Sequence, residues 1–343
     1  MRVLWITPGF AANEHDLNCI PPLYLLADEL SRIGVDLHIL TIAYPFTSQP
    51  YKWNGIPVVP GYGFNGRWFR WLNHQRVLKN AKIANQIKKF DVIHSFWFGP
   101  AWLIGQRLHK LWGIPHYTTL MGQDALTENW YLRFFKSVHA KSLIAISEVH
   151  NDIFAKSTGT RAAHSIPWGV RDQEIPTQLA GTRTVDVLGC GSLIPLKNWQ
   201  LWLDVVEGLV KYNPELKAEL IGDGPERKNI EELIQQKGLQ KNVFLSGNLP
   251  RPQVLARMRD SKVLLHTSNY ESFGYVLAEA AMNGCRIVST PVGIAPQLTD
   301  YIAQGDVLIE QTKKVLELPI KSTPFVPFLM SKTGQQYLKL YQI

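Results

Sequence analysis

The chain has 343 residues, 45% of them hydrophobic, which is enough to bury a large core and favours two domains over one or three. Its three cysteines, Cys19, Cys190 and Cys285, are scattered and odd in number, which excludes a disulfide framework and a zinc-ligand spacing. No stretch approaches the roughly 20 apolar residues of a membrane span.

The first residues, Met1 to Ala12, contain an apolar run that Pro8 and Gly9 interrupt. We predict a first buried strand here rather than a signal peptide, and therefore a cytoplasmic protein. Lys and Arg outnumber Asp and Glu by 17 to 10 in residues 1–170, and by 19 to 18 in the remainder. This one-sided charge indicates an anionic partner for the first half: a membrane surface, a nucleic acid or a phosphorylated substrate.

Short apolar runs alternate with helical patterns throughout the first half. The predicted strands are Val3–Thr7, Val35–Thr41, Val92–Ser95, His116–Leu120 and Leu143–Ile146, and the predicted helices are Leu23–Ile33, Ala101–Trp112 and Glu148–Lys156. Such alternation is typical of an α/β fold in which a parallel sheet carries helices on both faces. Ligands then bind beyond the carboxyl ends of the strands.

The second half repeats this pattern. The predicted strands are Val185–Leu188, Ala218–Ile221, Val243–Leu245, Val263–His266 and Arg286–Ser289, and the predicted helices are Trp199–Lys211, Glu226–Lys237, Pro252–Arg259 and Gly274–Met282. A stretch rich in Pro, Gly and Thr separates the halves and is typical of a linker. We expect two Rossmann-like domains facing a central cleft, at residues 1–168 and 184–325, with a linker at 169–183 and a terminal helical segment at 326–343.

Two acidic residues stand out between Ser268 and Pro291. Glu279 lies within the otherwise apolar helical run Tyr275–Met282, where a buried charge is costly unless it is partnered. Glu271 precedes Gly274, where a loop turns into that helix and backbone N–H groups could bind an anion. Two carboxylates flanking a phosphate cradle suit a ligand with sugar hydroxyls, diphosphate and ribose. The alternative is an ordinary ion pair for Glu279 and a solvated Glu271.

The spacing of Glu271 and Glu279 within ESFGYVLAEAAMNGCRIVST resembles the E-x7-E segment of retaining group 1 glycosyltransferases of the GT-B fold. The resemblance is clear from about residue 180 to 300. It implies that Glu271 holds hydroxyls of a donor sugar and that Glu279 holds the nucleotide ribose. Donor contacts are also implied for Ser272, Phe273 and Gly274. The resemblance further implies a terminal helix that crosses back onto the first domain.

Further donor contacts follow from the same resemblance. Lys197, after a strand and turn, is expected to neutralise a leaving diphosphate as a catalytic cation. The family usually places an Arg five residues earlier, where this chain has Ser192, so Arg251 is a candidate replacement. The loop with Asn248 and Leu249 is implied to contact the nucleotide base through its backbone.

In the first domain, the resemblance directs attention to the segment Thr118–Asp124. Met121 stands where the family commonly has His, and would keep only a carbonyl contact to the donor. Asp124 is the candidate for orienting a hydroxyl, with a helix cap as the alternative. Gly9 could replace a Gly-Gly pair that this chain lacks. No Asp-x-Asp pair or metal-ligand cluster occurs, so we expect no metal cofactor.

Seven basic residues and no acid lie between Arg67 and Lys89. On a helical projection, Val77, Ala81, Ala84 and Ile87 share one face, opposite Lys79, Lys82 and Lys89. This suits docking on an anionic membrane surface, and the alternative is an ordinary solvated helix. No motif for reading nucleic acid accompanies the basic stretch, so we expect no nucleic-acid partner.

These features predict an enzyme that transfers a sugar, with retention, from a nucleotide diphosphate sugar to a glycan or lipid-linked acceptor in polysaccharide or glycolipid synthesis. Its place would be the cytoplasm, including the inner face of the membrane. One alternative is a sugar-nucleotide epimerase or a glycan phosphorylase, since these enzymes can share the same fold. A catalytically silent scaffold is a further alternative, because Ser192 and Met121 depart from the active pattern.

Overall fold

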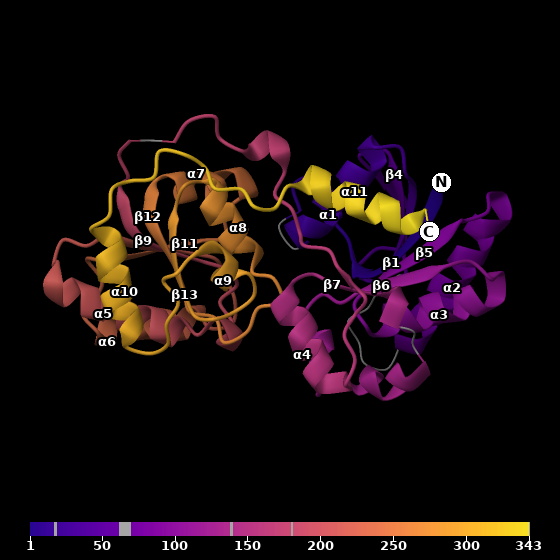
Figure 1. The fold of residues 1–343 in the computed structure, drawn as a ribbon, viewed down its shortest axis with the longest axis horizontal. Coiled ribbons are helices and arrows are strands. Elements are labelled where there is room, and N and C mark those ends of the chain that lie inside the picture. The colour runs from indigo at the N-terminus through magenta and orange to yellow at the C-terminus, as the bar shows by residue number, and fades with distance from the viewer. Residues whose placement is uncertain (17–18, 62–69, 138–139, 180, 343) are drawn as a thin grey trace. The chain divides into compact units, whose positions relative to one another are not determined.

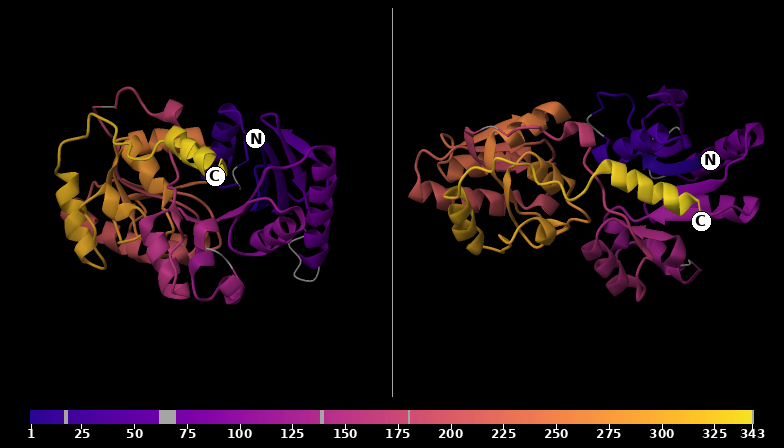
Figure 2. Two further views of the ribbon diagram at one scale, coloured as in Figure 1. Left: turned by 45° about the vertical axis from the view of Figure 1, so that its right-hand side comes forward. Right: turned by 45° about the horizontal axis from the view of Figure 1, so that its top comes forward.

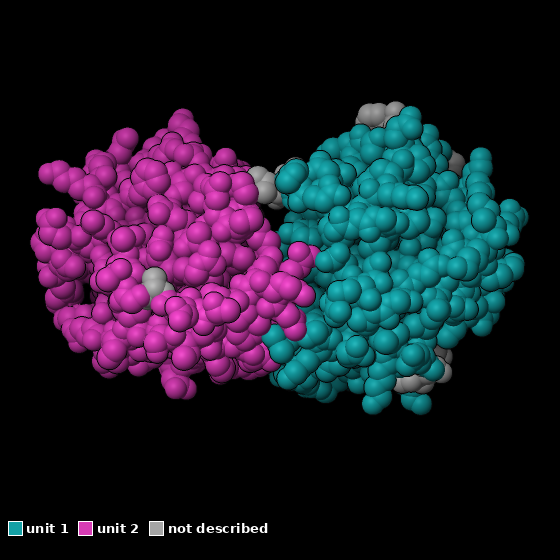
Figure 3. Space-filling model, turned by 90° about the horizontal axis from the view of Figure 1, so that it is seen from above, with its two compact units in different colours: residues 1–169, 329–343 teal, residues 170–328 magenta. Residues whose placement is uncertain are grey.

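The computed structural model describes residues 1–16, 19–61, 70–137, 140–179 and 181–342. They form two compact units (Figure 3). Unit 1 comprises residues 1–169 and 329–343, and unit 2 comprises residues 170–328. The boundary therefore falls at the start of the expected linker, most of which belongs to unit 2, and the terminal helix belongs to unit 1.

The described part of unit 1 contains an eight-stranded sheet in the order β3-β4-β2-β1-β5-β6-β7-β8 (Figure 1). The strands are β1 (Arg2–Gly9), β2 (Asp36–Tyr44), β3 (Tyr51–Trp53), β4 (Ile56–Pro60), β5 (Val92–Phe96), β6 (His116–Thr119), β7 (Leu143–Ala145) and β8 (His164–Ser165). All neighbours pair in parallel except β3 and β4, which form a hairpin around Asn54 and Gly55, both at positive φ. The sheet is thus mixed at one edge, contrary to the all-parallel expectation.

Helices cover both faces of this sheet. They are α1 (Pro21–Arg32), α2 (Arg70–Ile87), α3 (Pro100–Trp112), α4 (Glu148–Thr158) and α11 (Met330–Tyr341). Because side chains alternate along β1, Leu4 and Ile6 pack with α2 and α3 on one face, while Trp5 donates to the Tyr341 hydroxyl of α11 on the other. Helices α1 and α11 lie side by side (Figures 1 and 2).

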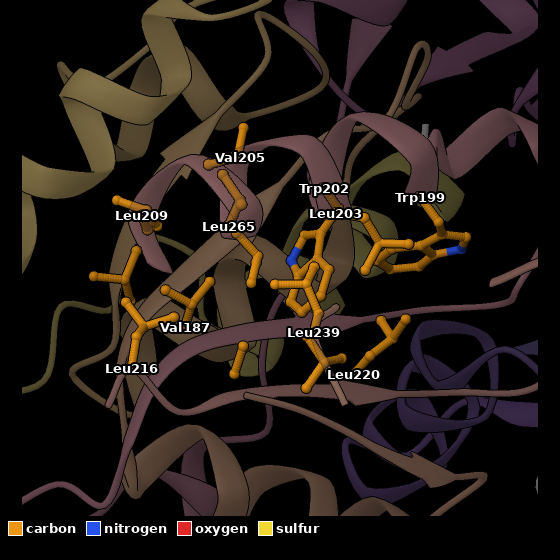
Figure 4. Packing of buried hydrophobic residues seen from close by; sticks show 14 of the residues in the cluster. Val187, Trp199, Trp202, Leu203, Val205, Leu209, Leu216, Leu220, Leu239 and Leu265 are labelled. Atoms are coloured by element: carbon orange, nitrogen blue, oxygen red, sulfur yellow. The ribbon is translucent and has the colours of Figure 1, made fainter. Parts of the chain in front are cut away.

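The described part of unit 2 holds a five-stranded, fully parallel sheet in the order β11-β10-β9-β12-β13. Its strands are β9 (Val185–Cys190), β10 (Ala218–Ile221), β11 (Val243–Gly247), β12 (Ser261–His266) and β13 (Arg286–Ser289). Its helices are α5 (Trp199–Tyr212), α6 (Arg227–Gln236), α7 (Arg251–Arg259), α8 (Tyr275–Met282), α9 (Ala295–Leu298) and α10 (Val307–Leu316). Trp202 and Leu209 of α5 pack against Val187 and Leu265 of the sheet to form the core of this unit (Figure 4).

Local signals explain the ends of two helices. Pro100 opens α3 and Gly113 closes it at φ +70, while Ser147 caps α4 by accepting from the His150 N–H. Helix α6 begins at Arg227, one residue after the predicted start at Glu226. Helices α9 and α10 lie between Met282 and the terminal segment and were not among the predicted helices.

Candidate functional site

The carboxyl ends of the five strands of unit 2 lie at one edge of its sheet, because all five are parallel. The loop after β9 carries Lys197, the loop after β11 carries Asn248 and Leu249, and the loop after β12 carries Glu271 to Gly274. Residues separated by as many as 77 positions are thereby brought to one edge. This is the position at which α/β sheets bind ligands.

Glycines allow the loop after β9 and the loop after β10 to approach each other closely. A Cβ added to Gly222, which has φ +142, would lie 1.9 Å from the Gly191 carbonyl oxygen. A Cβ on Gly224 would lie 2.5 Å from the Leu193 carbonyl oxygen, and the Leu193 N–H donates to Asp223. Only residues without a side chain permit this backbone-to-backbone packing, which fixes the loop that presents Lys197.

Glu271 lies at the centre of a buried polar cluster. Its Oε1 accepts from the Lys197 ammonium, from the Ser268 hydroxyl at 2.9 Å and from His266 Nε2 at 3.1 Å. Burial opposes ionisation of Glu271, but the hydrogen bond and charge of His266 and the charge of Lys197 outweigh it and lower the pKa to about 2. Glu271 is therefore an anion at neutral pH. Its Oε2 has no hydrogen-bond partner among the described residues.

His266 was not among the site residues predicted from the sequence. It ends a strand whose carboxyl end was expected to face the site, and a polar residue at that position is the signal that could have identified it.

Glu279 is buried in α8, with 9% of its side chain exposed, and forms an ion pair with Arg251. The same guanidinium donates to both carboxylate oxygens of Glu174, with Nη2 2.5 Å from Oε2, and lies 5.6 Å from the Tyr275 ring centroid. Arg251, the candidate replacement for an Arg at Ser192, is thus shared by two acids. Glu174 falls in the segment taken for a linker, where no sequence signal marked it.

The segment from Ser272 to Gly274 forms the turn into α8. Gly274 precedes the helix at φ +80, and Phe273 is buried with its carbonyl accepting from the Ile294 N–H at 2.8 Å. A Cβ on Gly293 would lie 2.2 Å from that same carbonyl oxygen, so the loop after β13 holds this turn in place.

In unit 1, Gly9 ends β1 and Met121 follows β6, both at the carboxyl edge of the sheet. Asp124 is buried, and its carboxylate accepts from the backbone N–H groups of Phe98, Met121 and Gly122 at 2.6 to 3.2 Å. These contacts hold loops together and differ from the helix cap considered as the alternative, because Gly122 precedes the short helix Gln123–Ala125 and Asp124 lies within it. The carboxylate joins the loops that follow β5 and β6.

The basic stretch is described only in part, because residues 62–69 lie outside the described residues. In α2, Val77, Ala81 and Ala84 are buried in the core as predicted, whereas Ile87 is 81% exposed, so its placement on the apolar face was wrong. Lys79 and Lys82 are exposed. The described part of α2 has the pattern of a helix with one packed and one solvated face.

Two further observations concern the described residues as a whole. No group of three or more His, Cys, Asp or Glu side chains among them is arranged to hold a metal ion. No helix formed by the described residues has both the length and the apolar character needed to cross a membrane.

Two protein families match this chain. The family described as "Glycosyl transferases group 1" matches residues 171–316, and "Glycosyltransferase Family 4" matches residues 23–174.

Individual proteins show the same likeness. The chain is 30% identical over 325 residues to the "Phosphatidylinositol N-acetylglucosaminyltransferase GPI3 subunit" of Saccharomyces cerevisiae, covering 86% of this chain and 71% of the yeast protein. It is 27% identical over 132 residues to the "Poly(ribitol-phosphate) alpha-N-acetylglucosaminyltransferase" of Staphylococcus aureus, covering 37% of this chain and 26% of that protein.

Solved structures share the fold at low identity. HepE of Anabaena, solved in complex with UDP and glucose, superposes with a TM-score of 0.74 at 18% identity, covering 99% of both chains. Sucrose-phosphate synthase from Thermosynechococcus elongatus superposes with a TM-score of 0.73 at 13% identity, covering 100% of this chain and 98% of that one.

Proposed function

Because this chain belongs to the group 1 glycosyltransferases of the GT-B fold, we propose that it transfers a sugar from a nucleotide diphosphate sugar to an acceptor hydroxyl with retention of configuration. Unit 2 binds the donor at the carboxyl edge of its sheet, and unit 1 binds the acceptor.

The Glu271 cluster is the observation that carries this proposal. Lys197, Ser268 and His266 all contact Oε1, which holds the carboxylate in one orientation. Oε2 is left to accept a hydrogen bond from a sugar hydroxyl, and a charged acceptor gives such a bond roughly twice the strength of a neutral one. A pKa of about 2 keeps this acceptor ionised at neutral pH.

Lys197 supplies the charge for the leaving group. Its ammonium already touches Glu271, so a diphosphate bound beside the sugar would lie within reach of the same cation. Stabilising the charge that develops on the departing phosphate lowers the barrier more than binding the ground state does. No described side chain is assigned as a nucleophile. Retention then follows from attack on the leaving-group face, with the departing phosphate accepting the proton of the acceptor hydroxyl.

Glu279 and Arg251 form the ribose end of the proposed site. The ribose diol hydrogen-bonds to Glu279, while Arg251 retains its second carboxylate partner, Glu174. When the ribose hydrogen-bonds to Glu279, Arg251 thus keeps its ion pair with Glu174. This second pair lowers the free-energy cost of burying the Arg251 charge.

The relatives suggest which donor to test first. The yeast and staphylococcal proteins are named as N-acetylglucosaminyltransferases, and HepE was solved with UDP. We therefore propose UDP-N-acetylglucosamine as the first donor and a glycan or lipid-linked acceptor, with the protein working at the cytoplasmic membrane surface without a metal cofactor.

Two substitutions test the donor site. Lys197→Ala should lower kcat by on the order of 10²-fold, because one charge-stabilising group is lost from the transition state. Glu279→Ala should instead weaken UDP binding. The measurements are product formation followed by mass spectrometry and titration calorimetry with UDP. Lys228→Ala, on an 88% exposed side chain of the same unit, is the matched control. Unchanged kinetics and binding in both site variants would refute the assignment.

A catalytically silent scaffold is the second candidate, favoured by the ion pair that Glu279 makes and by Ser192 in place of a cation. Calorimetry with a nucleotide panel separates the two, since a scaffold needs to bind none. Epimerised donor without a transfer product, or a requirement for inorganic phosphate, would indicate the remaining alternatives of the fold class.

A further inference from the structure

Unit 1 contains a cavity of about 610 Å³ at the carboxyl edge of its sheet. It is bordered by Pro8 at the end of β1, by residues 97–100 after β5 and by residues 123–131 after β6. Its volume lies within the roughly 300–1,000 Å³ of ordinary ligand sites. Three of the lining residues are aromatic, namely Trp97, Phe98 and Tyr131, although the Phe98 ring itself is buried against Trp102.

Trp97 in this lining has a strained backbone. Its φ is +70°, a conformation that bulky side chains rarely adopt and that costs roughly 1–3 kcal/mol. The neighbouring contacts impose it: the Trp97 N–H donates to the Thr119 carbonyl at 3.0 Å, and the Phe98 N–H donates to Asp124 at 2.7 Å. Strained residues of this kind cluster at ligand-binding sites, which makes Trp97 a candidate ligand contact.

The same contacts use several of the backbone donors that border the cavity. The N–H groups of Trp97, Phe98, Met121 and Gly122 are all donated to protein oxygens. Pro100, at the first turn of α3, has no N–H. These four amides are therefore not available to an anion, which leaves only the first N–H groups of α3 as backbone donors at this point.

The charge of the lining also disfavours an anion. Two carboxylic acids, Asp124 and Glu128, border the cavity. The described lining contains no Lys or Arg. Glu128 and Gln123 are exposed and can hydrogen-bond with hydroxyl groups, while the aromatic side chains offer apolar surface.

We propose that this cavity receives the acceptor as a sugar or cyclitol ring without an anionic substituent, with one face of the ring against Trp97 and its hydroxyls bound by Glu128 and Gln123. This inference rests on the proposed transferase function and names the acceptor class for it. Any phosphate of the acceptor lies outside the cavity. The basic residues of unit 1, such as Lys79 and Lys82 of α2, are not part of this lining.

Saturation-transfer NMR with matched ring pairs tests the proposal: octyl glucoside with its glucuronide, octyl galactoside with its galacturonide, and inositol with inositol 1-phosphate. The uncharged member of at least one pair should bind to the wild-type protein, and its affinity should fall about 5-fold to 10-fold in Trp97→Gly. Glycine adopts a positive φ without strain, so this variant is expected to fold. A melting temperature at or above that of the wild-type protein checks this. Phe46→Ala, on a 63% exposed aromatic residue of the same unit, is the control.

A charge reversal provides the second arm. Glu128→Lys, at an exposed position, should improve binding of the anionic member of each pair about fivefold relative to its neutral partner. The proposal is overturned if wild-type protein prefers the anionic rings, if no neutral ring binds, or if both variants leave ring binding unchanged. Titration with UDP is measured in parallel. UDP binding without ring binding refutes only this inference, whereas absence of UDP binding refutes the proposed function.

Discussion

Asp124 illustrates how a carboxylate at a ligand-binding edge can serve the backbone. Three N–H groups from two loops converge on its two oxygens, and its charge favours such bonds. His150 lies behind the same loop and donates from Nε2 to the Gly122 carbonyl oxygen, 3.1 Å away. Asp124 therefore shapes the wall of the cavity in unit 1, because it holds the backbone of Phe98 and Gly122 in place.

Replacing Asp124 separates these roles. Asp124→Ala should lower the free energy of unfolding by at least about 3 kcal/mol, because it leaves three backbone donors without their acceptor. Asp124→Asn, which keeps one oxygen, should recover part of this loss. Urea unfolding measures both. A loss of activity in Asp124→Ala at unchanged stability would instead support a role in orienting the acceptor hydroxyl.

Gly222 allows a second test at the scale of one residue. Gly222→Ala should cost more than about 3 kcal/mol, because its Cβ would overlap the Gly191 carbonyl in addition to straining a backbone at φ +142. Gly238→Ala is the matched control, since Gly238 also has positive φ, +68, but has open space around it. That variant should lose only about 1–2 kcal/mol. Equal losses in thermal unfolding would contradict the close approach of the two loops.

Helix α11 shows what an element contributes from the far end of the chain. The Tyr341 hydroxyl lies 2.5 Å from His94 Nδ1 and accepts a hydrogen bond from the Trp5 indole N–H. The Tyr337 hydroxyl lies 3.0 Å from the Thr119 hydroxyl. These side chains are buried, so the helix completes one face of the sheet of unit 1. His94 is fully buried and belongs to this network, in which it also contacts the Thr119 hydroxyl.

The network predicts the effect of removing one hydroxyl. Tyr341→Phe should destabilise unit 1 by about 1–3 kcal/mol, because His94 and Trp5 lose a buried partner. Tyr212→Phe, at a 61% exposed position of unit 2, should change stability by less than about 0.5 kcal/mol. Hydrogen exchange of unit 1 peptides measures the difference, and equal protection in the two variants would show that the network contributes nothing.

At the scale of the whole molecule, the two units differ in how acid should affect them. In unit 1, burial lowers the pKa of His38 to about 4, of His116 to about 3 and of His94 well below its usual value. The unfolded chain takes up these protons near pH 6.5, so unit 1 loses stability as the pH falls from 6.5 toward 3 to 4. In unit 2, the stability from Glu271 is present above about pH 4.5 and is lost as the pH falls toward 2.

Unit 1 should therefore open first on acidification. Hydrogen-exchange mass spectrometry between pH 7 and 4 should show protection falling in peptides of residues 1–169 before those of 170–328. His38→Gln should remove about one proton from the pH dependence, which is roughly 1.4 kcal/mol per pH unit. Opening of both units together, or of unit 2 first, would contradict this prediction.

Much of the fold could be predicted because periodicity is a local property. Buried parallel strands such as Val187 and its neighbours form short apolar runs, and the helices between them show a 3.6-residue repeat. The hairpin at Asn54–Gly55 had its own local signal, an Asn-Gly turn, and could also have been found. Lys197, Glu271 and Glu279 could be selected from residue types and spacing alone.

Only tertiary structure decided which partners these residues have. Glu174 and Arg251 are 77 positions apart, and the contact of Arg251 with Glu279 depends on how α7 and α8 pack. His266, the amides around Asp124 and the strain at Trp97 follow likewise from contacts between distant strands. The sequence determined which segments are strands and helices, because that depends on neighbours along the chain. Burial, charge pairing and cavity lining depend on neighbours in space.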